Sequence, residues 1–379
     1  MHVAHLTLHD FRSWPELDVE LGPGATSFVG RNGQGKTNLV EAIDYLSRLS
    51  SHRVAGDAPL VRAGCTQAVV RAAVIRDERR AVLEVEINPG KSNRARINRS
   101  PLPRARELLG LVRSVVFSPE DLVLVKGDPS DRRHFADDLL VQLHPRHAST
   151  RSDYDRVLKQ RNSLLKTAGL ARRGSSSAES ALSTLDVWDG NLAKFGAEIV
   201  AARLQLVEDL RPLLVASYAA VARGARDDAA MTYRCSFLDE VTGPQPVAEL
   251  EQALLDTLGK RRNDELDRGI SLVGPHRDEL PFALGDLPVK GYASHGESWS
   301  FALALRLASY DLLRSGGDDP ILILDDVFAE LDVGRRDQLA GMVADAEQVL
   351  VTAAVADDVP SDLQGARFLV ADGAVTADA

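Results

Sequence analysis

The alternation of apolar and polar positions predicts a β-rich beginning, a helical middle and an α/β end. Residues 5–11 alternate in the manner of a strand, and residues 25–29 form a short β-prone run that stops at Gly30. From residue 37 to residue 49 the apolar positions recur at helical spacing, so we expect a helix with one core-facing side. Residues 30–37 therefore connect a strand to a helix N-terminus.

The middle of the chain is predicted to be mainly helical. Residues 67–75 and 81–87 still have the pattern of two strands, joined by the polar turn 76–80, but from residue 121 to about residue 269 the pattern is helical. The clearest helix has apolar residues at alternating steps of three and four, namely Leu185, Trp188, Leu192, Phe195, Ile199, Ala202 and Leu206. This seam fits either a short antiparallel coiled coil or a helix in an ordinary bundle. The polar segment 172–178 is typical of a flexible loop.

Strand patterns return near the end of the chain. Residues 321–324 and 348–352 are continuous apolar runs, as found in buried parallel strands, and a helix is predicted between them. The predicted fold class is therefore α/β. One lobe is expected from residues 1–118 and 270–379, and a mainly helical lobe, residues 119–269, is inserted between its two parts.

Composition limits the location and the partners of the protein. The longest apolar runs are far shorter than the ~20 residues of a membrane-spanning helix, and the first residues lack the features of an export signal. We therefore expect a cytoplasmic protein without membrane contact. Cys65 and Cys235 have no cysteine neighbours, which favours buried thiols over a disulfide or a zinc site. The formal charge of -10 opposes polyanionic partners, but residues 91–106 include six basic and no acidic side chains.

Residues 30–37 fit the pattern GxxxxGK[ST] of a phosphate-binding loop. Glycines in such a loop let successive backbone N–H groups surround phosphate oxygens at a helix N-terminus. Lys36 is expected to contact the β and γ phosphates of ATP, and Thr37 to hold Mg²⁺ through its hydroxyl. The predicted ATP-binding residues of the loop are Gly30, Arg31, Asn32, Gly33, Gln34, Gly35, Lys36 and Thr37.

Two carboxylates follow the buried run 321–324. They stand at the C-terminal end of a predicted parallel strand, where open α/β sheets bind their ligands. Asp325 is expected to bind Mg²⁺, directly or through water, and Asp326 to orient the attacking water as a general base. Paired aspartates also end strands as helix caps, but the phosphate-binding loop upstream favours a Walker B element.

A third element separates ABC-type ATPases from other phosphate-loop proteins. The segment Ser294-His295-Gly296-Glu297-Ser298 fits Ser-x-Gly-x-x before an apolar helix, where a hydroxyl, a glycine N–H and a helix N-terminus form a second anion site. Alone it would be a helix cap, but its place between the other two elements favours a signature motif. One phosphate group cannot be enclosed by two distant sites of a monomer. In ABC-type ATPases the second site acts on the nucleotide of a partner subunit. The likeness to these ATPases therefore implies that Ser294, Gly296 and Glu297 act in this way, in a homodimer that forms on ATP and opens after hydrolysis.

The chain resembles the RecF family of SMC-like ATPases over essentially its whole length. Besides the three elements above, the resemblance rests on Asp10-Phe11-Arg12-Ser13-Trp14, Asn38-Leu39-Val40-Glu41-Ala42-Ile43, Ser51-His52-Arg53, Phe117-Ser118-Pro119-Glu120-Asp121-Leu122, Arg132-Arg133-His134-Phe135, Gly274-Pro275-His276-Arg277-Asp278 and the run from Leu324 to Asp332. It implies an ABC-type P-loop ATPase head with an inserted helical lobe. It also implies DNA binding, slow ATP hydrolysis stimulated by DNA, and work with RecO and RecR to place RecA at single-strand gaps.

The resemblance also suggests roles for single residues. It implies that Arg53 contacts ATP phosphates as a basic finger, that Gln67 senses the γ-phosphate and that Thr352 lies in the switch region. The chain departs from the family at Glu297, where Gln is more common, and at Ser298-Trp299, where a basic residue is common. The added negative charge is expected to weaken dimerisation or hydrolysis. Asp326, in place of the Glu of transporters, agrees with the family and suggests slow turnover.

Basic side chains of the predicted hairpin and of the segment after it are candidates for DNA contact. They are Arg76, Arg79, Arg80, Lys91, Arg94, Arg96 and Arg99. Phosphate contacts of this kind would be independent of base sequence and sensitive to salt, whether the DNA is double-stranded, single-stranded or gapped. A solvated, arginine-rich hairpin without a DNA-binding role is the alternative.

Three other functions fit part of the pattern. A transporter-type ATPase subunit is disfavoured by the helical insertion and by residues 274–278, and an SMC-like chromosome protein by a middle too short for a coiled-coil arm and hinge. An ATP-gated DNA clamp that does not hydrolyse ATP stays open as an alternative.

Overall fold

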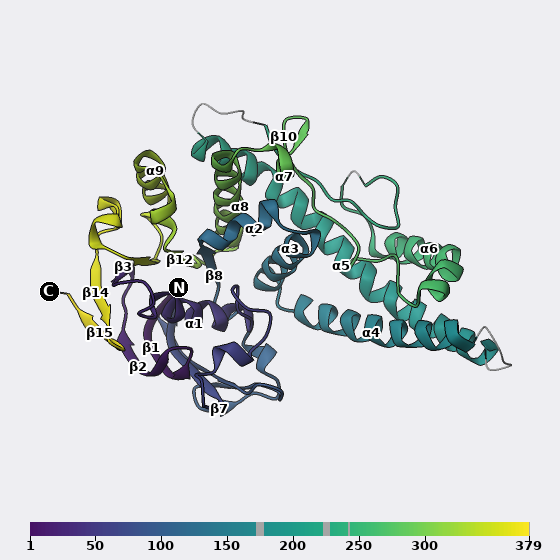
Figure 1. The fold of residues 1–379 in the computed structure, drawn as a ribbon, viewed down its shortest axis with the longest axis horizontal. Helices are drawn as coiled ribbons and strands as arrows, with labels where there is room; N and C mark the ends of the chain where they lie inside the picture. Colours follow the sequence, from purple (N-terminus) through teal and green to yellow (C-terminus); the bar gives the residue numbers. More distant parts are fainter. Residues whose placement is uncertain (172–177, 223–227, 242, 379) are drawn as a thin grey trace. The chain divides into compact units, whose positions relative to one another are not determined.

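The computed structural model describes residues 1–171, 178–222, 228–241 and 243–378. It divides into two compact units, each described by itself below (Figure 1). Unit 1 comprises Met1–Leu122, Ser217–Ala225 and Trp299–Ala379, and unit 2 comprises Val123–Ala216 and Arg226–Ser298. The predicted flexible loop 172–178 lies outside the described residues except for its last position. No helix in the described part of the chain combines the length and the hydropathy required to span a bilayer.

Unit 1 contains a mixed sheet built from both ends of the chain. Its strand order is β15-β14-β3-β13-β12-β8, and all neighbours are parallel except the pair β14 and β15. The strands are β3 (Gly24–Val29), β8 (Ser114–Phe117), β12 (Ile321–Asp325), β13 (Gln348–Ala353), β14 (Ala366–Ala371) and β15 (Ala374–Ala377). Every residue of β8, β12 and β13 is buried, which explains why their sequences are continuous rather than alternating runs.

A second sheet of unit 1 is antiparallel, in the order β2-β1-β4-β5-β6-β7. Its strands are β1 (His2–Phe11), β2 (Trp14–Glu20), β4 (Ala68–Arg76), β5 (Arg79–Ile87), β6 (Arg94–Ile97) and β7 (Ser100–Pro101). The hairpin of β4 and β5 is confirmed, but its turn is shorter than the predicted 76–80. Arg76 pairs with Arg79, and the two residues between them, Asp77 and Glu78, have the positive φ values, 47° and 61°, that a two-residue hairpin turn requires.

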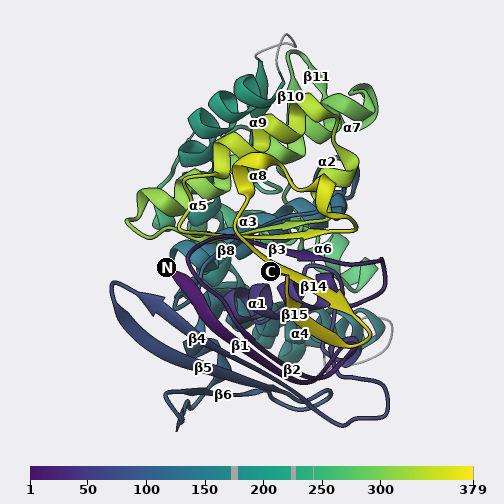
Figure 2. The ribbon, with the colours of Figure 1, turned by 90° about the vertical axis from the view of Figure 1, so that its left-hand side faces the viewer.

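Helix α1 (Lys36–Arg48) lies between the two sheets of unit 1 (Figure 2). Its apolar residues Leu39 and Ile43 are fully buried in one core with Leu6 of the antiparallel sheet and Ile323 of the mixed sheet. The predicted helix is thus confirmed, and both of its sides are covered. Unit 1 also contains α9 (Val333–Val343), most of α8 (His295–Ser315) and the short 3₁₀ segments η1 (Ala58–Leu60), η2 (Ala105–Leu108), η3 (Pro119–Asp121), η4 (Val327–Glu330), η5 (Ala356–Asp358) and η6 (Ser361–Leu363).

Unit 2 is mainly helical. It contains all or most of α2 (Leu122–Lys126), α3 (Pro129–Leu143), α4 (His147–Ala171), α5 (Ala178–Val221), α6 (Val247–Arg268) and α7 (Val289–Tyr292). The predicted heptad seam lies on α5, where Leu185 packs against Leu165 of α4 and Leu266 of α6. Because one seam residue contacts two different helices, the structure favours a bundle over a two-stranded coiled coil.

A buried arginine joins the three long helices of unit 2. Arg161 of α4 has no exposed surface, and it donates to Asp189 of α5 and to Glu265 of α6, both at 2.6 Å. Its remaining Nη1 donates to Ser271 at 2.8 Å. Two carboxylates therefore compensate the loss of hydration of one guanidinium, as a buried charge requires.

Unit 2 extends further along the chain than the predicted lobe 119–269. Strand β10 (Phe282–Leu284) pairs on one side with β9 (Ala229–Met231) and on the other with β11 (Leu287–Pro288), in a small antiparallel sheet. The segment 270–298 consequently belongs to unit 2, and the last part of unit 1 begins at Trp299 instead of residue 270. Strands of two or three residues have too few positions to show a period, so the sequence pattern placed this boundary too early.

Candidate nucleotide-binding site

The loop 30–37 connects the end of β3 to the N-terminus of α1. Gly33 and Gly35 have φ values of 84° and 96°, in the left-handed region that favours glycine. A Cβ atom on Gly30 would lie 2.1 Å from the carbonyl oxygen of Val370, so this position also excludes a side chain. The Lys36 Nζ is turned back over the loop and donates to the Gly30 carbonyl at 2.8 Å. Backbone conformation and packing thus explain the glycines, and the loop has the form of a phosphate cradle.

The turn between β1 and β2 packs directly against this loop. The indole Nε1 of Trp14 donates to the Gly35 carbonyl at 3.1 Å, and Asn38 Nδ2 donates to Ser13 Oγ at 2.8 Å. A Cβ atom on Gly35 would lie 2.7 Å from Ser13 Oγ. Sequence reasoning used residues 10–14 only for the family resemblance and missed this support of the loop, because no local pattern shows which distant turn a loop contacts.

The Walker B strand ends beside the first turn of α1. Thr37 Oγ1 donates to Asp325 Oδ1 at 3.0 Å, and the hydroxyl of Thr352, on the neighbouring strand β13, donates to the same oxygen at 2.6 Å. The backbone N–H of Asp326 in turn donates to Thr352 Oγ1 at 2.9 Å. Loop, Walker B and the proposed switch position are therefore joined in one hydrogen-bond network, although they lie far apart in the sequence.

The environment of Asp325 fits a divalent cation. Burial raises the pKa of Asp325, the charge of Asp326 raises it further, and the hydroxyls of Thr352 and Thr37 oppose the shift. A cation would favour the ionised carboxylate. Mg²⁺ commonly takes one or two protein oxygens and completes its shell with phosphate and water oxygens. The Thr37 hydroxyl and the Asp325 carboxylate, which lie 3.0 Å apart, are such a pair of donors.

The structure places Arg53 close to the loop and gives no such contact for Gln67. Arg53 Nη1 donates to the side chain of Asn38, the residue after Thr37, at 3.0 Å, and to Glu41 Oε2 at 3.2 Å. Gln67 is exposed immediately before β4, and the hydrogen bonds found among the described residues do not join it to the loop.

The predicted signature segment forms a capping box at the start of α8. The backbone N–H of Ser294 donates to Glu297 Oε2 at 2.8 Å, and the N–H of Glu297 donates to Ser294 Oγ at 3.2 Å. The Ser298 hydroxyl donates to the Ser294 carbonyl at 2.8 Å. Ser294 and His295 are exposed, so the N-terminus of the helix is accessible. Glu297 completes this box, as the Gln that is more common at this position also could.

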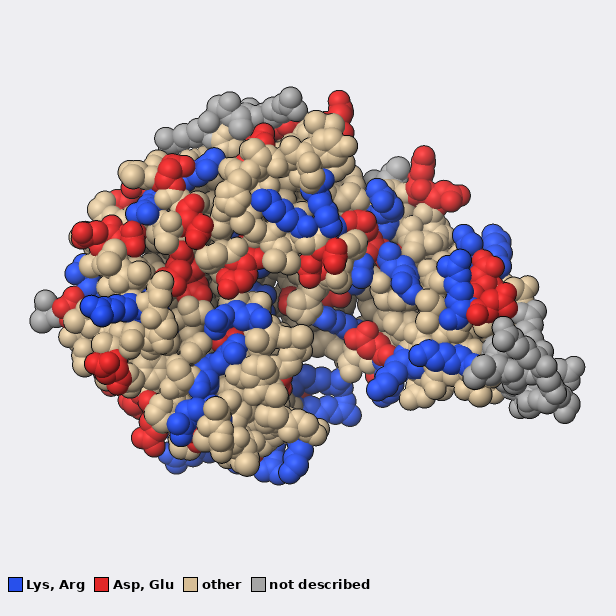
Figure 3. Space-filling model, in the orientation of Figure 1, with Lys and Arg blue, Asp and Glu red and all other residues tan. Residues whose placement is uncertain are grey.

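The candidate DNA-binding residues divide into paired and unpaired side chains. Arg96 and Arg94 form ion pairs with Glu84 and Glu86 of β5, and Arg76 pairs with Asp318. The other candidates are exposed and have no ion pair among the described residues: Arg79, Arg80, Lys91 and Arg99. Lys and Arg side chains gather along the edge of unit 1 near β7 (Figure 3). The four unpaired cations lie at the start of β5 (Arg79 and Arg80) and in the connections before and after β6 (Lys91 and Arg99).

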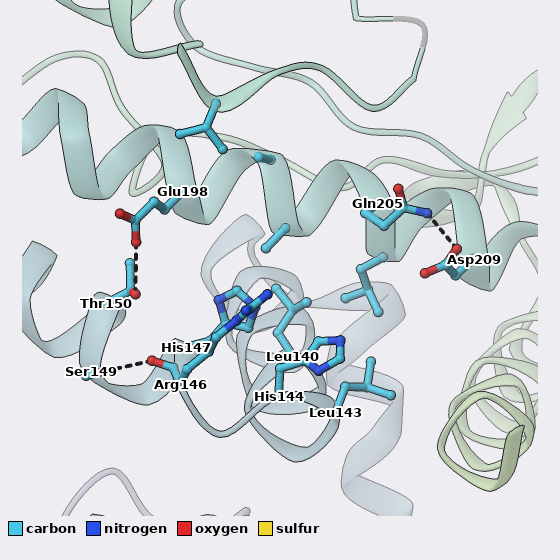
Figure 4. Close-up of a pocket in the computed structure, with 14 residues that line it drawn as sticks. Leu140, Leu143, His144, Arg146, His147, Ser149, Thr150, Glu198, Gln205 and Asp209 are labelled. Carbon is cyan, nitrogen blue, oxygen red and sulfur yellow. Dashed lines mark hydrogen bonds between the residues drawn. The ribbon is translucent and has the colours of Figure 1, made fainter. Parts of the chain in front are cut away.

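Unit 2 also has a cavity of about 490 Å³ between α3, α4 and α5 (Figure 4). Its walls include His144 and His147, and burial lowers the pKa of His147. One acidic side chain of the rim, Glu198, accepts a hydrogen bond from Thr150 at 3.1 Å, and another, Asp209, accepts one from Gln205 at 2.8 Å. None of the predicted nucleotide or DNA residues lines this cavity.

Comparison with known proteins identifies the family. Residues 2–359 match the model of the RecF/RecN/SMC N terminal domain. The chain is 65% identical to the DNA replication and repair protein RecF of Nocardioides sp., and the match covers 99% of each chain. It is 58% identical to the protein of the same name from Streptomyces avermitilis, again over 99% of each chain. The chain belongs to the RecF family.

Solved structures agree with the RecF assignment. A structure of the recombination mediator protein RecF-ATP in the RecFOR pathway is 27% identical, with a TM-score of 0.88 over 100% of this chain and 98% of that one. The Smc head domain of Pyrococcus furiosus, with an extended coiled coil and bound to the C-terminal domain of ScpA, is 14% identical, with a TM-score of 0.54 over 100% of this chain and 96% of that one. The latter likeness concerns the fold alone. The predicted family and the predicted ABC-type α/β fold class are confirmed.

Proposed function

We propose that this RecF-family chain is an ATP-gated DNA-binding protein of recombinational repair and replication restart. It binds ATP and Mg²⁺, forms a homodimer with nucleotide between the two copies, and binds DNA. The observation that supports the nucleotide site most directly is the contact of the Thr37 hydroxyl with Asp325, because it brings the phosphate-binding loop and the Walker B carboxylate together at 3.0 Å. The RecF-ATP structure supports the same ligand.

Each residue of this site has a defined task in the proposed mechanism. The loop N–H groups and Lys36 hold the phosphates, and Thr37 and Asp325 hold Mg²⁺, which would neutralise charge on the β and γ phosphates. Arg53 contacts the phosphates from the side of α1. Asp326 orients the attacking water and accepts its proton. Its backbone N–H donates to the Thr352 hydroxyl at 2.9 Å, which supports a role of Thr352 in holding the backbone of this residue in place.

The signature residues Ser294, Gly296 and Glu297 act on the nucleotide of the second copy. The exposed capping box supports this assignment, because a serine hydroxyl and a helix N-terminus together favour a negatively charged group. Glu297 places a carboxylate at the same position, so we expect ATP-dependent dimers that are weaker than those of a protein with Gln there.

The DNA partner binds through its phosphates, and the exposed cations of the antiparallel sheet support this role. Arg79, Arg80, Lys91 and Arg99 lack ion pairs among the described residues and are the first choice for contact, while Arg76, Arg94 and Arg96 share their charge with carboxylates. RecO and RecR are the proposed protein partners, and RecA loading at single-strand gaps is the proposed outcome. The description of the related RecF as a recombination mediator of the RecFOR pathway supports the partners RecO and RecR.

Gel filtration with and without ATP tests the proposed dimer. The wild-type chain should elute as a dimer only with ATP and Mg²⁺, and Lys36→Ala should remain monomeric in both conditions. A wild-type chain that stays monomeric with ATP and Mg²⁺ contradicts the sandwich mechanism.

DNA-stimulated phosphate release distinguishes an ATPase from a clamp that only binds. We expect slow release by the wild type and background release by Asp326→Asn. Equal background rates for both proteins would favour the second candidate, an ATP-gated clamp without hydrolysis, which the short Asp326 side chain makes a realistic competitor.

A further inference from the structure

A buried carboxylate of α1 is shared by two arginines from different segments. The Glu41 side chain has no exposed surface. Its two oxygens accept from Arg12 Nη2 at 2.6 Å and from Arg12 Nε at 2.9 Å, in a two-point contact. One oxygen also accepts from Arg53 Nη1 at 3.2 Å, and the other from Ser51 Oγ at 2.5 Å. Glu41 thus connects the turn before the loop with the arginine beside it.

The two arginines differ in how firmly they are held. The Arg12 side chain is 14% exposed, and besides its two bonds to Glu41 it donates to the Pro59 carbonyl at 3.1 Å. The Arg53 side chain is 30% exposed and reaches Glu41 through one nitrogen at 3.2 Å. Two-point contacts of an arginine with a carboxylate are stronger and geometrically more defined than single ones. Arg53 is therefore the partner that can leave.

The backbone also fixes Arg12 in place. Its φ of 52° is in the left-handed region, which is unusual for a residue with a side chain. The flanking contacts hold this conformation, since the Arg12 N–H donates to the Leu60 carbonyl at 2.7 Å and the Arg62 N–H donates to the Asp10 carbonyl at 2.8 Å. Conformations of this kind persist where the surrounding structure enforces them, often close to functional sites.

Charge balance determines what happens when Arg53 moves. A buried carboxylate without a counter-charge is strongly unfavourable, so Glu41 must keep at least one cation. With Arg12 in place, Arg53 can exchange its contact with Glu41 for a contact with phosphate while Glu41 stays neutralised. Without Arg12, Glu41 would retain Arg53 as its only counter-charge.

We propose that Arg12 is a positioning residue of the nucleotide site, which neutralises Glu41 and thereby releases Arg53 to the γ-phosphate of ATP. The inference rests on the proposed phosphate contact of Arg53. In the proposed mechanism Arg12 itself does not contact the nucleotide, and it does not belong to the phosphate-binding loop. Its effect should be specific for ATP over ADP, because only ATP has the γ-phosphate.

The test is the affinity of the full chain for fluorescent ATP and ADP analogues with Mg²⁺. Arg12→Gln should weaken ATP binding by about tenfold, as expected for withdrawing one charge-assisted contact, and change ADP binding by less than about twofold. Arg12→Lys keeps the charge without the two-point contact and should lie between Arg12→Gln and the wild type. Arg62→Gln is the matched control, because Arg62 belongs to an ion pair with Asp10 in the same region and does not contact Glu41.

Variants of Glu41 show whether Arg12 acts by releasing Arg53 or only by stabilising the fold. The double variant Arg12→Gln/Glu41→Gln removes both charges, so Arg53 is no longer retained and ATP affinity should return to within about threefold of the wild type. Glu41→Gln alone should bind ATP as tightly as the wild type or more tightly. If Glu41→Gln weakens ATP binding, or if the double variant is no better than Arg12→Gln, the proposal is wrong.

Arg53→Ala distinguishes this failure from a failure of the proposed function. If Arg53→Ala binds ATP like the wild type, the phosphate contact of Arg53 does not exist and the inference falls with it. If Arg53→Ala binds ATP poorly while Arg12→Gln and Arg12→Lys bind it normally, only the role of Arg12 is refuted. Thermal unfolding of each variant shows whether the protein is folded, and the Lys variant remains informative if Arg12→Gln does not fold.

Discussion

Two segments are proposed to bind nucleotide, residues 30–37 and residues 294–297. Their polar groups find hydrogen-bond partners in different ways. In the first, loop atoms bond to distant parts of unit 1, with Trp14 on the Gly35 carbonyl and Asp325 on the Thr37 hydroxyl. In the second, Ser294 and Glu297 bond to each other. A segment fixed from outside is prepared for its ligand before the ligand arrives. A segment whose polar groups bond to each other must break an internal hydrogen bond to bind its ligand. Its state can therefore depend on whether the partner subunit is present.

The strongest way to break this comparison is to remove the contact that prepares the first segment. Asp325→Asn should lower DNA-stimulated ATP hydrolysis by about a hundredfold, the usual scale for the loss of one preorganised charged group. Stability should change in the opposite direction. Because burial raises the pKa of Asp325, its ionised form destabilises the nucleotide-free fold at pH values above that pKa, and an amide avoids this cost.

Phosphate release and thermal unfolding without nucleotide measure the two effects of Asp325→Asn. A variant that loses activity because it unfolds at a lower temperature would contradict the prediction.

A substitution in the second segment, residues 294–297, should impair dimerisation instead of ATP binding. Ser294→Ala should keep the ATP affinity of its own loop but lose dimerisation by at least about tenfold, since a helix cap and a charge-assisted contact are both removed. An equal mixture with Lys36→Ala should recover part of the ATP hydrolysis, because one of the two composite sites in a mixed dimer is intact. Each variant alone serves as the control. No recovery in the mixture would show that Ser294 acts within its own chain.

Acid should affect unit 2 through His276. Burial lowers the pKa of His276 to about 4, while Tyr154 donates to its Nδ1 at 2.7 Å and its Nε2 donates to the Ser271 carbonyl at 3.3 Å. The unfolded chain therefore binds a proton at a higher pH than the folded one. The stability that this residue contributes is present above pH 6.5, and it declines by about 1 kcal/mol as the pH falls from about 6.5 to 5.5.

Denaturant unfolding at several pH values measures this decline, with His276→Gln as the comparison. The variant should be less stable at neutral pH and should lose less stability on acidification. Parallel pH profiles for the two proteins would exclude His276 as the source.

The smallest expected effect comes from Glu297→Gln. Glutamine can also complete a capping box, so the stability of α8 should change little. Removing the carboxylate from the signature should strengthen ATP-dependent dimerisation by about threefold, the scale of a single partly screened charge. Sedimentation at increasing salt is the measurement, and the difference between the two proteins should shrink as salt rises.

Much of the nucleotide site could be predicted from sequence, because its elements are local. The loop glycines, the run before Asp325 and the helix from residue 37 each follow from a short pattern. The capping box was also present in the spacing of Ser294 and Glu297. What sequence could not show is pairing over long distances, such as Trp14 with Gly35 or Arg12 with Glu41, because these contacts depend on how the β1–β2 turn packs on α1.

The Thr352 hydroxyl has a consequence for the amino acids tolerated at this position. It donates to Asp325 and accepts from the N–H of Asp326, so a single oxygen aligns both acidic residues. Valine has the same shape and the same preference for a strand, but it can make neither bond. In a library randomised at codon 352 and selected for survival of DNA damage, the recovered clones should encode threonine or serine, and valine should be depleted even though it folds.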